Sequence, residues 1–199
     1  MQFKIPESLK KLSKILHNNL YIVGGFVRNS IMGLTTDDID ICSDITLDNL
    51  QVLLSQTPFD VKVKSKTLGT AIISIKDQKY EYSCFRKEVY ADDGSHVPIS
   101  VEFIKEPRED AVRRDFTINA LYYDIAKDEI LDFYTGIEDI NKKILRTVEN
   151  PEFVLANDGV RILRLFRFQS ELGFKIEKET LMTAIKYASN VKALNGERV

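Results

Sequence analysis

The sequence is poor in the residues on which disulfide scaffolds and zinc sites depend. Its 199 residues include two cysteines, Cys42 and Cys84, two histidines, His17 and His96, and no tryptophan. The cysteines form no CxxC pattern, and the two scattered histidines are too few to complete a zinc cluster. We therefore expect reduced, half-buried strand cysteines in a cytoplasmic protein.

Long apolar runs and a large excess of charge of one sign are also missing. No segment reaches the roughly 20 apolar residues that a membrane-spanning helix needs, so we expect no membrane partner. The first residues, "MQFKIPESLKKLSKIL", are amphipathic and charged, which argues against a signal peptide. A formal net charge of -2 excludes a protein that simply coats nucleic acid, although charge can still be segregated between faces.

What the sequence does contain is a succession of short helical and strand patterns. Helices are predicted at 7–18, 26–33 and 46–56, and strands at 20–23, 38–42, 59–65, 69–75, 79–85 and 98–104. Residues 108–125, "REDAVRRDFTINALYYDI", are predicted as one helix running towards a strand at 129–134. Only helical patterns follow, at 157–174 and 178–191. We predict an α+β fold, with a mixed-sheet domain over 1–136 and an all-helical segment over 137–199.

The segment "TTDDIDICSD" (35–44) crowds acidic residues beside isoleucines. Residues two positions apart in a strand point to the same face, so Asp38 and Asp40 would share one side while Ile39 and Ile41 face the core. Such a pair suits Mg²⁺, which takes one or two protein carboxylates and completes its shell with water and phosphate oxygens. A solvated acidic turn is the alternative that this segment alone leaves open.

Two further features bear on that alternative. A third carboxylate on a neighbouring strand would support a metal site, and Glu81 in "YEYSCF" is the first candidate, with Glu102 in "SVEFI" the second. Upstream, "YIVGGFVRNS" predicts a strand, the turn Gly24-Gly25 and a helix containing Arg28. Glycines let a backbone approach a phosphate closely, and an arginine one turn later can bind the same phosphates. Together these features favour a triphosphate with Mg²⁺ as one ligand.

These motifs stand in a sequence that resembles the class II tRNA nucleotidyltransferases, the family of CCA-adding enzymes and bacterial poly(A) polymerases. "VGGFVRNSIMGLTTDDIDI" is similar to the family's signature. The family's order is then followed by "LGTAIISI", "YEYSCFRKEVY", "DGSHVPISVEFI", "RRDFTINALYYD" and "NDGVRILRLFRFQSELGF", over residues 20–175. The resemblance implies a polymerase-β-like nucleotidyltransferase head and an all-helical neck, cut short before the body and tail that hold tRNA.

The resemblance also implies the reaction and the residues that carry it. An RNA 3′-hydroxyl would attack the α-phosphate of CTP or ATP and release pyrophosphate, at the 3′ end of tRNA. Asp38 and Asp40 match the metal-binding pair, Glu81 falls where the family often has an acidic residue, and Gly24, Gly25 and Arg28 match the triphosphate-binding turn. One metal ion would lower the pKa of the hydroxyl while another neutralises the departing phosphates.

A second motif, "RRDFTINA" (113–120), is predicted to lie within two helical turns. Its two cations, carboxylate and amide can bind phosphates and a ribose, with the carboxylate orienting an arginine. The resemblance implies the same roles for Arg113, Arg114, Asp115 and Asn119. A charged helix surface is the alternative.

A third motif, "NDGVRILRLFRF" (157–168), is predicted to recognise the base. Helical steps of about 100° place Arg161 roughly 60° from Asp158, and Arg164 about as far again. A carboxylate accepts from an exocyclic amine and an arginine donates beside it, a pair that suits cytosine and adenine and rejects uracil and guanine. The resemblance implies the same choice of CTP and ATP, and an ordinary i,i+3 salt bridge is the alternative.

Three positions depart from the family's pattern. Asn29 stands for an aspartate, Ser95 for an arginine in the loop "ADDGSH" (91–96), and Asn157 for a glutamate beside Asp158. We expect Asn29 to keep a capping role. The family ties the loop to the switch from C to A addition, and the change at Asn157 weakens the expected bracing of Arg161.

Two classes of function are therefore open. The first is a template-independent nucleotidyltransferase, with poly(A) polymerase and C-adding or A-adding enzymes as variants that share every motif. The second is a nucleotide- or RNA-binding module that has lost catalysis, which the three departures motivate. Retention of both Asp38 and Asp40 favours the enzyme, because neighbouring like charges are costly. The sequence does not decide the oligomeric state.

Overall fold

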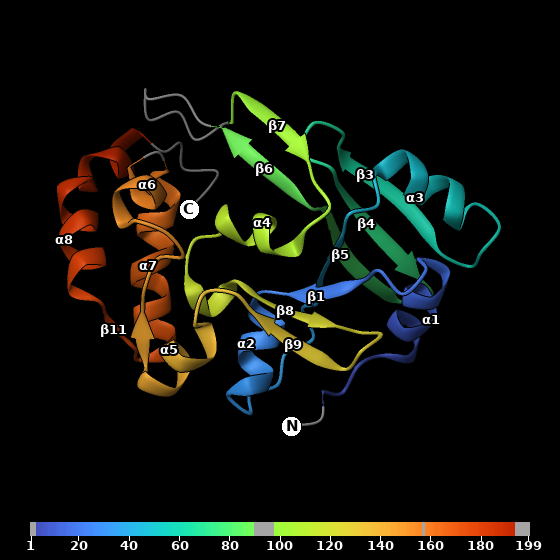
Figure 1. The fold of residues 1–199 in the computed structure, drawn as a ribbon, viewed down its shortest axis with the longest axis horizontal. Coiled ribbons are helices and arrows are strands. Elements are labelled where there is room, and N and C mark those ends of the chain that lie inside the picture. Colours follow the sequence, from blue (N-terminus) through green and yellow to red (C-terminus); the bar gives the residue numbers. More distant parts are fainter. Residues whose placement is uncertain (1–2, 90–97, 157, 194–199) are drawn as a thin grey trace.

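The computed structural model describes residues 3–89, 98–156 and 158–193. At its centre lies a seven-stranded mixed sheet with the strand order β3-β4-β5-β2-β1-β8-β9 (Figure 1). Every neighbouring pair is antiparallel except β2 and β5, which run parallel. The strands are β1 Tyr21–Val23, β2 Asp40–Ser43, β3 Asp60–Ser65, β4 Thr70–Ile75, β5 Gln78–Cys84, β8 Leu121–Asp124 and β9 Glu129–Asp132. The predicted α+β class is confirmed.

The two faces of this sheet bury different side chains, because successive strand residues point to opposite sides. Ile22 and Ile41 belong to the larger core, which also takes in the apolar faces of three helices, α1, α2 and α3. Val23 and Cys42 belong to a smaller core on the other face, with Ala111 of α4. The helices are α1 Glu7–Ile15, α2 Gly25–Ile31, α3 Leu47–Leu54 and α4 Pro107–Val112. Asp40 lies two residues before Cys42, so its side chain points to the same face of the sheet, the face that packs against α4.

Most of the predicted elements are confirmed, with boundaries that move by up to three residues, although the helix predicted at 178–191 ends at Lys186 and is followed by η2, Ala188–Ala193. Both cysteines lie in strands, as predicted, but they are buried fully rather than by half, at 0% and 1% exposure. A strand that was not predicted, β6 Arg86–Val89, pairs with β7 Ser100–Phe103 in a separate two-stranded sheet. The loop 91–96, with Ser95, lies outside the described residues, as does Asn157.

The single helix predicted over 108–125 is wrong. Helix α4 ends at Val112, a short 3-10 turn, η1, spans Thr117–Asn119, and the chain then enters β8. The carboxylate of Asp115 accepts a hydrogen bond from the backbone N–H of Phe116 at 2.8 Å, which is a local alternative to helical pairing. Residues of β8 pair with β1 on one side and β9 on the other, so the sheet overrides the helical pattern.

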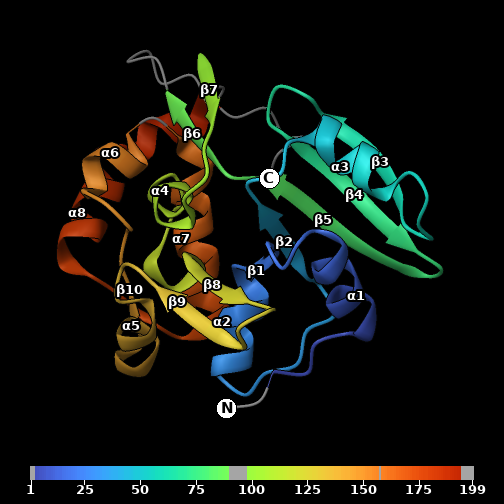
Figure 2. The ribbon, with the colours of Figure 1, turned by 45° about the vertical axis from the view of Figure 1, so that its right-hand side comes forward.

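The C-terminal part is mainly helical and stands beside one end of the sheet (Figures 1 and 2). It contains α5 Gly136–Lys142, α6 Pro151–Leu155, α7 Gly159–Leu172, α8 Lys178–Lys186 and the 3-10 helix η2 Ala188–Ala193. The prediction of an all-helical segment is wrong in one detail, since β10 Ile144–Leu145 pairs in parallel with β11 Lys175–Ile176. Two-residue strands are too short to leave an alternating pattern in the sequence.

Packing joins the helical part closely to the sheet. Ile162, Leu165 and Phe168 of α7 are buried in the same core cluster as Ile22 and Ile41. Gly136 permits the contact between α5 and η1, because an added Cβ would lie 2.3 Å from the carbonyl oxygen of Thr117. Among the described residues, no helix is both long and apolar enough to cross a membrane.

Candidate functional site

A polar cavity of about 560 Å³ opens between the sheet and α7, and we call it the arginine-lined cavity. It brings together every predicted site residue except Glu81, and it adds three residues that the sequence analysis missed. Its lining consists of Gly24, Gly25, Arg28, Asp38, Asp40, Arg113, Arg114, Asp115, Asn119, Asp158, Arg161, Arg164, Arg167, Phe168 and Glu171.

The glycine turn forms one wall. Gly24 has a φ of +75°, a left-handed conformation that favours glycine, and it connects β1 to the first residue of α2. Arg28, one turn later, is 7% exposed. Its guanidinium donates to Asn119 Oδ1 at 2.5 Å and to Asn29 Oδ1 at 3.1 and 2.9 Å. The expected capping role of Asn29 is therefore wrong, because its side chain orients Arg28 instead.

The acidic pair lies at and just before the start of β2, the strand that pairs with β1. Strand β2 begins only at Asp40, so the prediction that Asp38 shares its strand face is wrong: β1 ends at Val23, opposite Asp40, and gives Asp38 no partner strand. Both side chains nevertheless line the cavity. The pKa of Asp40 is raised to about 6, first by loss of solvation inside the cavity and then by the negative charges of Asp38 and Glu81. The two carboxylates are thus close enough to interact electrostatically.

Glu81 lies beside Asp40 rather than inside the cavity. The two residues are register partners across the parallel pair β2–β5, and Glu81 forms an ion pair with Lys64 at 2.9 Å. Glu102 is the register partner of Lys87 in the separate two-stranded sheet, so of the two candidates Glu81 alone lies on a strand beside Asp40. Within the described ranges, no three His, Cys, Asp or Glu side chains are grouped to hold a metal ion. The oxygen donors of Asp38 and Asp40 fit Mg²⁺ only if phosphates or water complete its shell.

The "RRDFTINA" residues come from the end of α4, a loop and η1 rather than from two helical turns. Asp115 accepts from Arg164 Nε at 2.6 Å and, more weakly, from Asn119 Nδ2 at 3.4 Å. Burial alone would raise the pKa of Asp115, but the charge and hydrogen bond of Arg164 lower it below its ordinary value. The carboxylate is therefore held ionised and orients Arg164.

A buried carboxylate that the sequence analysis missed supports both adjacent arginines. Asp110 has no exposed surface and accepts hydrogen bonds from Arg113 Nε, Arg114 Nη2, the Tyr122 hydroxyl and the backbone N–H of Arg86, at 2.6–3.1 Å. Burial opposes its ionisation, yet the two arginines lower the pKa of Asp110 to about 2. The i,i+3 and i,i+4 spacing of acid and arginine in "DAVRR" was the available signal.

The helical angle predicted between Asp158 and Arg161 requires Asp158 to lie within α7. Instead, Asp158 is the N-cap of α7 and its carboxylate accepts a hydrogen bond from the Val160 N–H at 2.9 Å. Arg161 still lies beside it, with Nε 3.6 Å from Asp158 Oδ2. The same guanidinium donates to the carbonyl oxygens of Arg113 at 2.8 Å and Val154 at 3.3 Å. Backbone carbonyls therefore brace Arg161.

Three guanidinium groups surround one aromatic ring in this cavity. Arg28, Arg164 and Arg167 place their central carbons 5.1, 5.2 and 5.1 Å from the centroid of Phe168, within the range of cation–π attraction. Phe168 is 5% exposed and packs edge-on against Phe116. The repeated i+3 spacing of arginines along α7 could have indicated Arg167, whereas nothing in the sequence pattern indicated Phe168.

Comparison with known proteins places this architecture in a family. The model of the poly(A) polymerase head domain matches residues 20–146. CCA-adding enzymes of Bacillus velezensis and Enterococcus faecalis are 41% and 33% identical over 92% and 98% of the chain, covering 46% and 48% of their own lengths. The solved Bacillus stearothermophilus CCA-adding enzyme in complex with CTP superposes with a TM-score of 0.80 at 28% identity, over 98% of this chain and 47% of that one.

The chain thus spans about half the length of the curated relatives it matches. The family model covers more than half of the chain. Its matched range begins just before β1 and ends just after β10, so it includes the glycine turn, β2 and η1. The chain therefore belongs to the class II tRNA nucleotidyltransferases, the family of CCA-adding enzymes and bacterial poly(A) polymerases.

Proposed function

We propose that this chain carries the catalytic and nucleotide-binding part of a template-independent enzyme that adds C and A, from CTP and ATP, to the 3′ end of tRNA. The observation that carries the proposal is the arginine-lined cavity, where Asp38 and Asp40 face arginines and the Asp158–Arg161 pair. Relatives named CCA-adding enzymes, and solved structures in complex with CTP, ATP or a primer tRNA, support it.

The roles follow from the contacts. Asp38 and Asp40 would hold Mg²⁺, which when bound neutralises phosphate charge and lowers the pKa of the attacking hydroxyl. Arg28, Arg164 and Arg167 supply guanidinium donors for the triphosphate, which suit phosphate oxygens. Arg113 and Arg114 extend that positive surface, and Asn119 and Asp115 hold Arg28 and Arg164 in place.

Asp158 and Arg161 would recognise the base. The carboxylate accepts from the exocyclic amine of cytosine or adenine, and the guanidinium donates to the neighbouring ring nitrogen or carbonyl. Uracil and guanine would turn a carbonyl towards the carboxylate and leave it unpaired. Glu81, beside Asp40, would add negative charge near the metal.

The test uses Mg²⁺, labelled CTP or ATP, and tRNA lacking its three terminal nucleotides or ending after one C or after CC. We expect C to be added to the first two substrates and A to the third, with incorporation lost in Asp38→Ala. Repeated A addition to all three would indicate a poly(A) polymerase, and addition of C or A alone a partial enzyme. Nucleotide binding without incorporation would instead support a non-catalytic module.

A further inference from the structure

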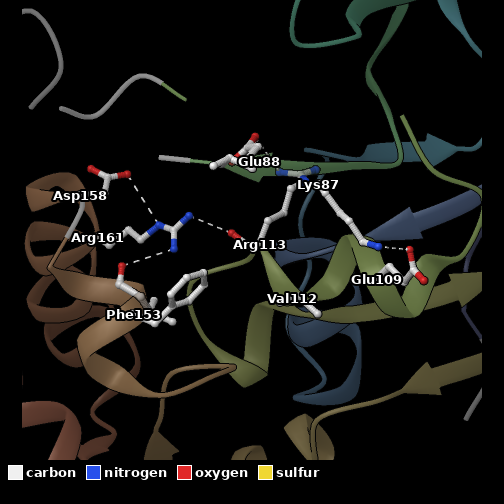
Figure 3. A pocket seen from close by; sticks show the side chains of 10 residues that line it. Lys87, Glu88, Glu109, Val112, Arg113, Phe153, Asp158 and Arg161 are labelled. Atoms are coloured by element: carbon white, nitrogen blue, oxygen red, sulfur yellow. Dashed lines mark hydrogen bonds and ion pairs between the residues drawn. The ribbon is translucent and has the colours of Figure 1, made fainter. Parts of the chain in front are cut away.

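A second cavity adjoins the first, and we call it the apolar cavity. Its volume is about 270 Å³, and it lies between β6, α4, α6 and the start of α7 (Figure 3). It shares Arg113, Asp158 and Arg161 with the arginine-lined cavity. Figure 3 shows Phe153 and Arg161 on one side of it and Val112 and Arg113 on the other.

The side chain of Phe153 gives this cavity an exposed aromatic wall. Asn150 caps α6 by accepting from Glu152 N–H, and Pro151 occupies its first turn. Val154 and Leu155, the two residues after Phe153, are fully buried in the core. Phe153 consequently points away from the core and is 59% exposed. An aromatic ring held on a capped helix beside a cavity is a surface on which another flat ring can stack.

The charges around the apolar cavity balance one another, because its three carboxylates are matched by three cations. Glu109 pairs with Lys87 at 2.7 Å, Glu88 lies 3.8 Å from Arg113, and Asp158 lies 3.6 Å from Arg161. The cavity therefore lacks the excess of guanidinium groups that would favour a triphosphate there. The volume is below the roughly 300–1,000 Å³ typical of sites for whole drug-sized ligands, and is therefore suited to one ring system rather than to a nucleotide. What the cavity offers is apolar walls and, at its border, the donor–acceptor pair of Arg161 and Asp158.

We propose that the apolar cavity takes the base of CTP or ATP, with the ring of Phe153 as its stacking wall, while the phosphates lie in the arginine-lined cavity. The inference rests on the proposed function, since it assumes that the ligand is a nucleoside triphosphate. The base enters with its polar edge towards Asp158 and Arg161, and its face covers Phe153. Phe153 is then a base-binding residue.

The test separates the two ends of the ligand. Dissociation constants for CTP, ATP and inorganic tripolyphosphate are measured by calorimetry, with Mg²⁺ present, for the unchanged chain, Phe153→Ala and Phe153→Tyr. The control is Phe166→Ala, because Phe166 lies on α7, is 40% exposed and lines neither cavity. Circular dichroism and thermal melting check the fold of each variant.

We expect Phe153→Ala to weaken CTP and ATP binding by about tenfold, the loss that follows from removing one stacking partner. Tripolyphosphate binding should be unchanged, Phe153→Tyr should retain nucleotide affinity, and Phe166→Ala should have no effect. Nucleotide affinity that is indifferent to Phe153→Ala, or a parallel loss of tripolyphosphate affinity, would overturn the inference and leave the proposed function standing. Failure of the unchanged chain to bind either nucleotide would overturn both.

Discussion

The two neighbouring cavities share three residues and differ in nearly everything else. Arginines of α2 and α7 and the acidic pair at the start of β2 line the first. The second has apolar walls formed by Val89, Val112, Phe153 and Val154, with paired charged residues around them. A triphosphate needs charge-assisted hydrogen bonds, and an aromatic base needs a flat apolar surface. A ligand with two chemically different ends therefore requires two adjoining surfaces, and the residues at their border must serve both.

The largest effect should come from a substitution that disturbs the residues shared by the two cavities. Asp110 holds Arg113, which lines both cavities, and Arg114. Asp110→Asn removes one partner of a buried charged group, so we expect the free energy of unfolding to fall by about 3–5 kcal/mol at pH 7. Urea unfolding measures the change, with the exposed Asp77→Asn as control.

The pH dependence of that loss has a definite sign. The pKa of Asp110 is lowered to about 2, so its stabilising contribution is present above its ordinary pKa of about 4 and disappears as the pH falls towards 2. The difference between the unchanged chain and Asp110→Asn should narrow over that range. A difference that stayed constant down to pH 2 would contradict the assignment.

A smaller effect should be confined to the arginine-lined cavity. Phe168→Leu removes the aromatic ring that three guanidinium groups share, and we expect tripolyphosphate binding to weaken by about tenfold. Phe116→Leu is the matched control, because Phe116 is a buried aromatic residue that packs against Phe168. Equal losses in the two variants, or losses that merely track their melting temperatures, would remove the special role of Phe168.

The smallest effect concerns metal binding. It should be confined to the arginine-lined cavity, because Asp40 lines this cavity and does not line the apolar cavity. The pKa of Asp40 is raised to about 6, so its carboxylate takes up a proton as the pH falls through 6. The proton then competes with a metal cation for the carboxylate. We expect Mn²⁺, as a probe for Mg²⁺, to bind about fourfold more weakly at pH 5.5 than at pH 7. Asp38→Asn removes a neighbouring negative charge and should move this transition to lower pH. A transition unaltered by Asp38→Asn would show that the two carboxylates do not interact.

Sequence patterns were most reliable where a local period controls the structure. Ile39 and Ile41 are buried as predicted, and α7 follows its helical spacing. The prediction failed at 108–125, where β1 and β9 draw residues 121–124 into the sheet. It failed also at Asp38, which lies outside β2, because the pairing with β1 and the pairing with β5 both begin at Asp40.

The site shows the same division. Motif residues such as Arg28, Asp40 and Arg164 could be chosen from the sequence because their chemistry and spacing suit phosphates and metal ions. Asp110 was missed although Arg113 and Arg114 follow it at helical spacing, because its burial depends on the fold. The position of Phe168 in the cavity likewise depends on the packing that brings Arg28 of α2 to it. Phe153 follows no motif, and its importance depends on the cavity beside it.

By itself the sequence determined the chemical groups: an acidic pair, a diglycine turn, arginines at helical spacing and enough apolar residues for two cores. Only the tertiary structure decided which groups meet. It turned Asn29 from a cap into a partner of Arg28, made Asp158 an N-cap, and placed Phe153 at the edge of a cavity. The physical reason is that hydrogen-bonding and aromatic contacts act over a few ångströms, and only packing brings distant segments within that range.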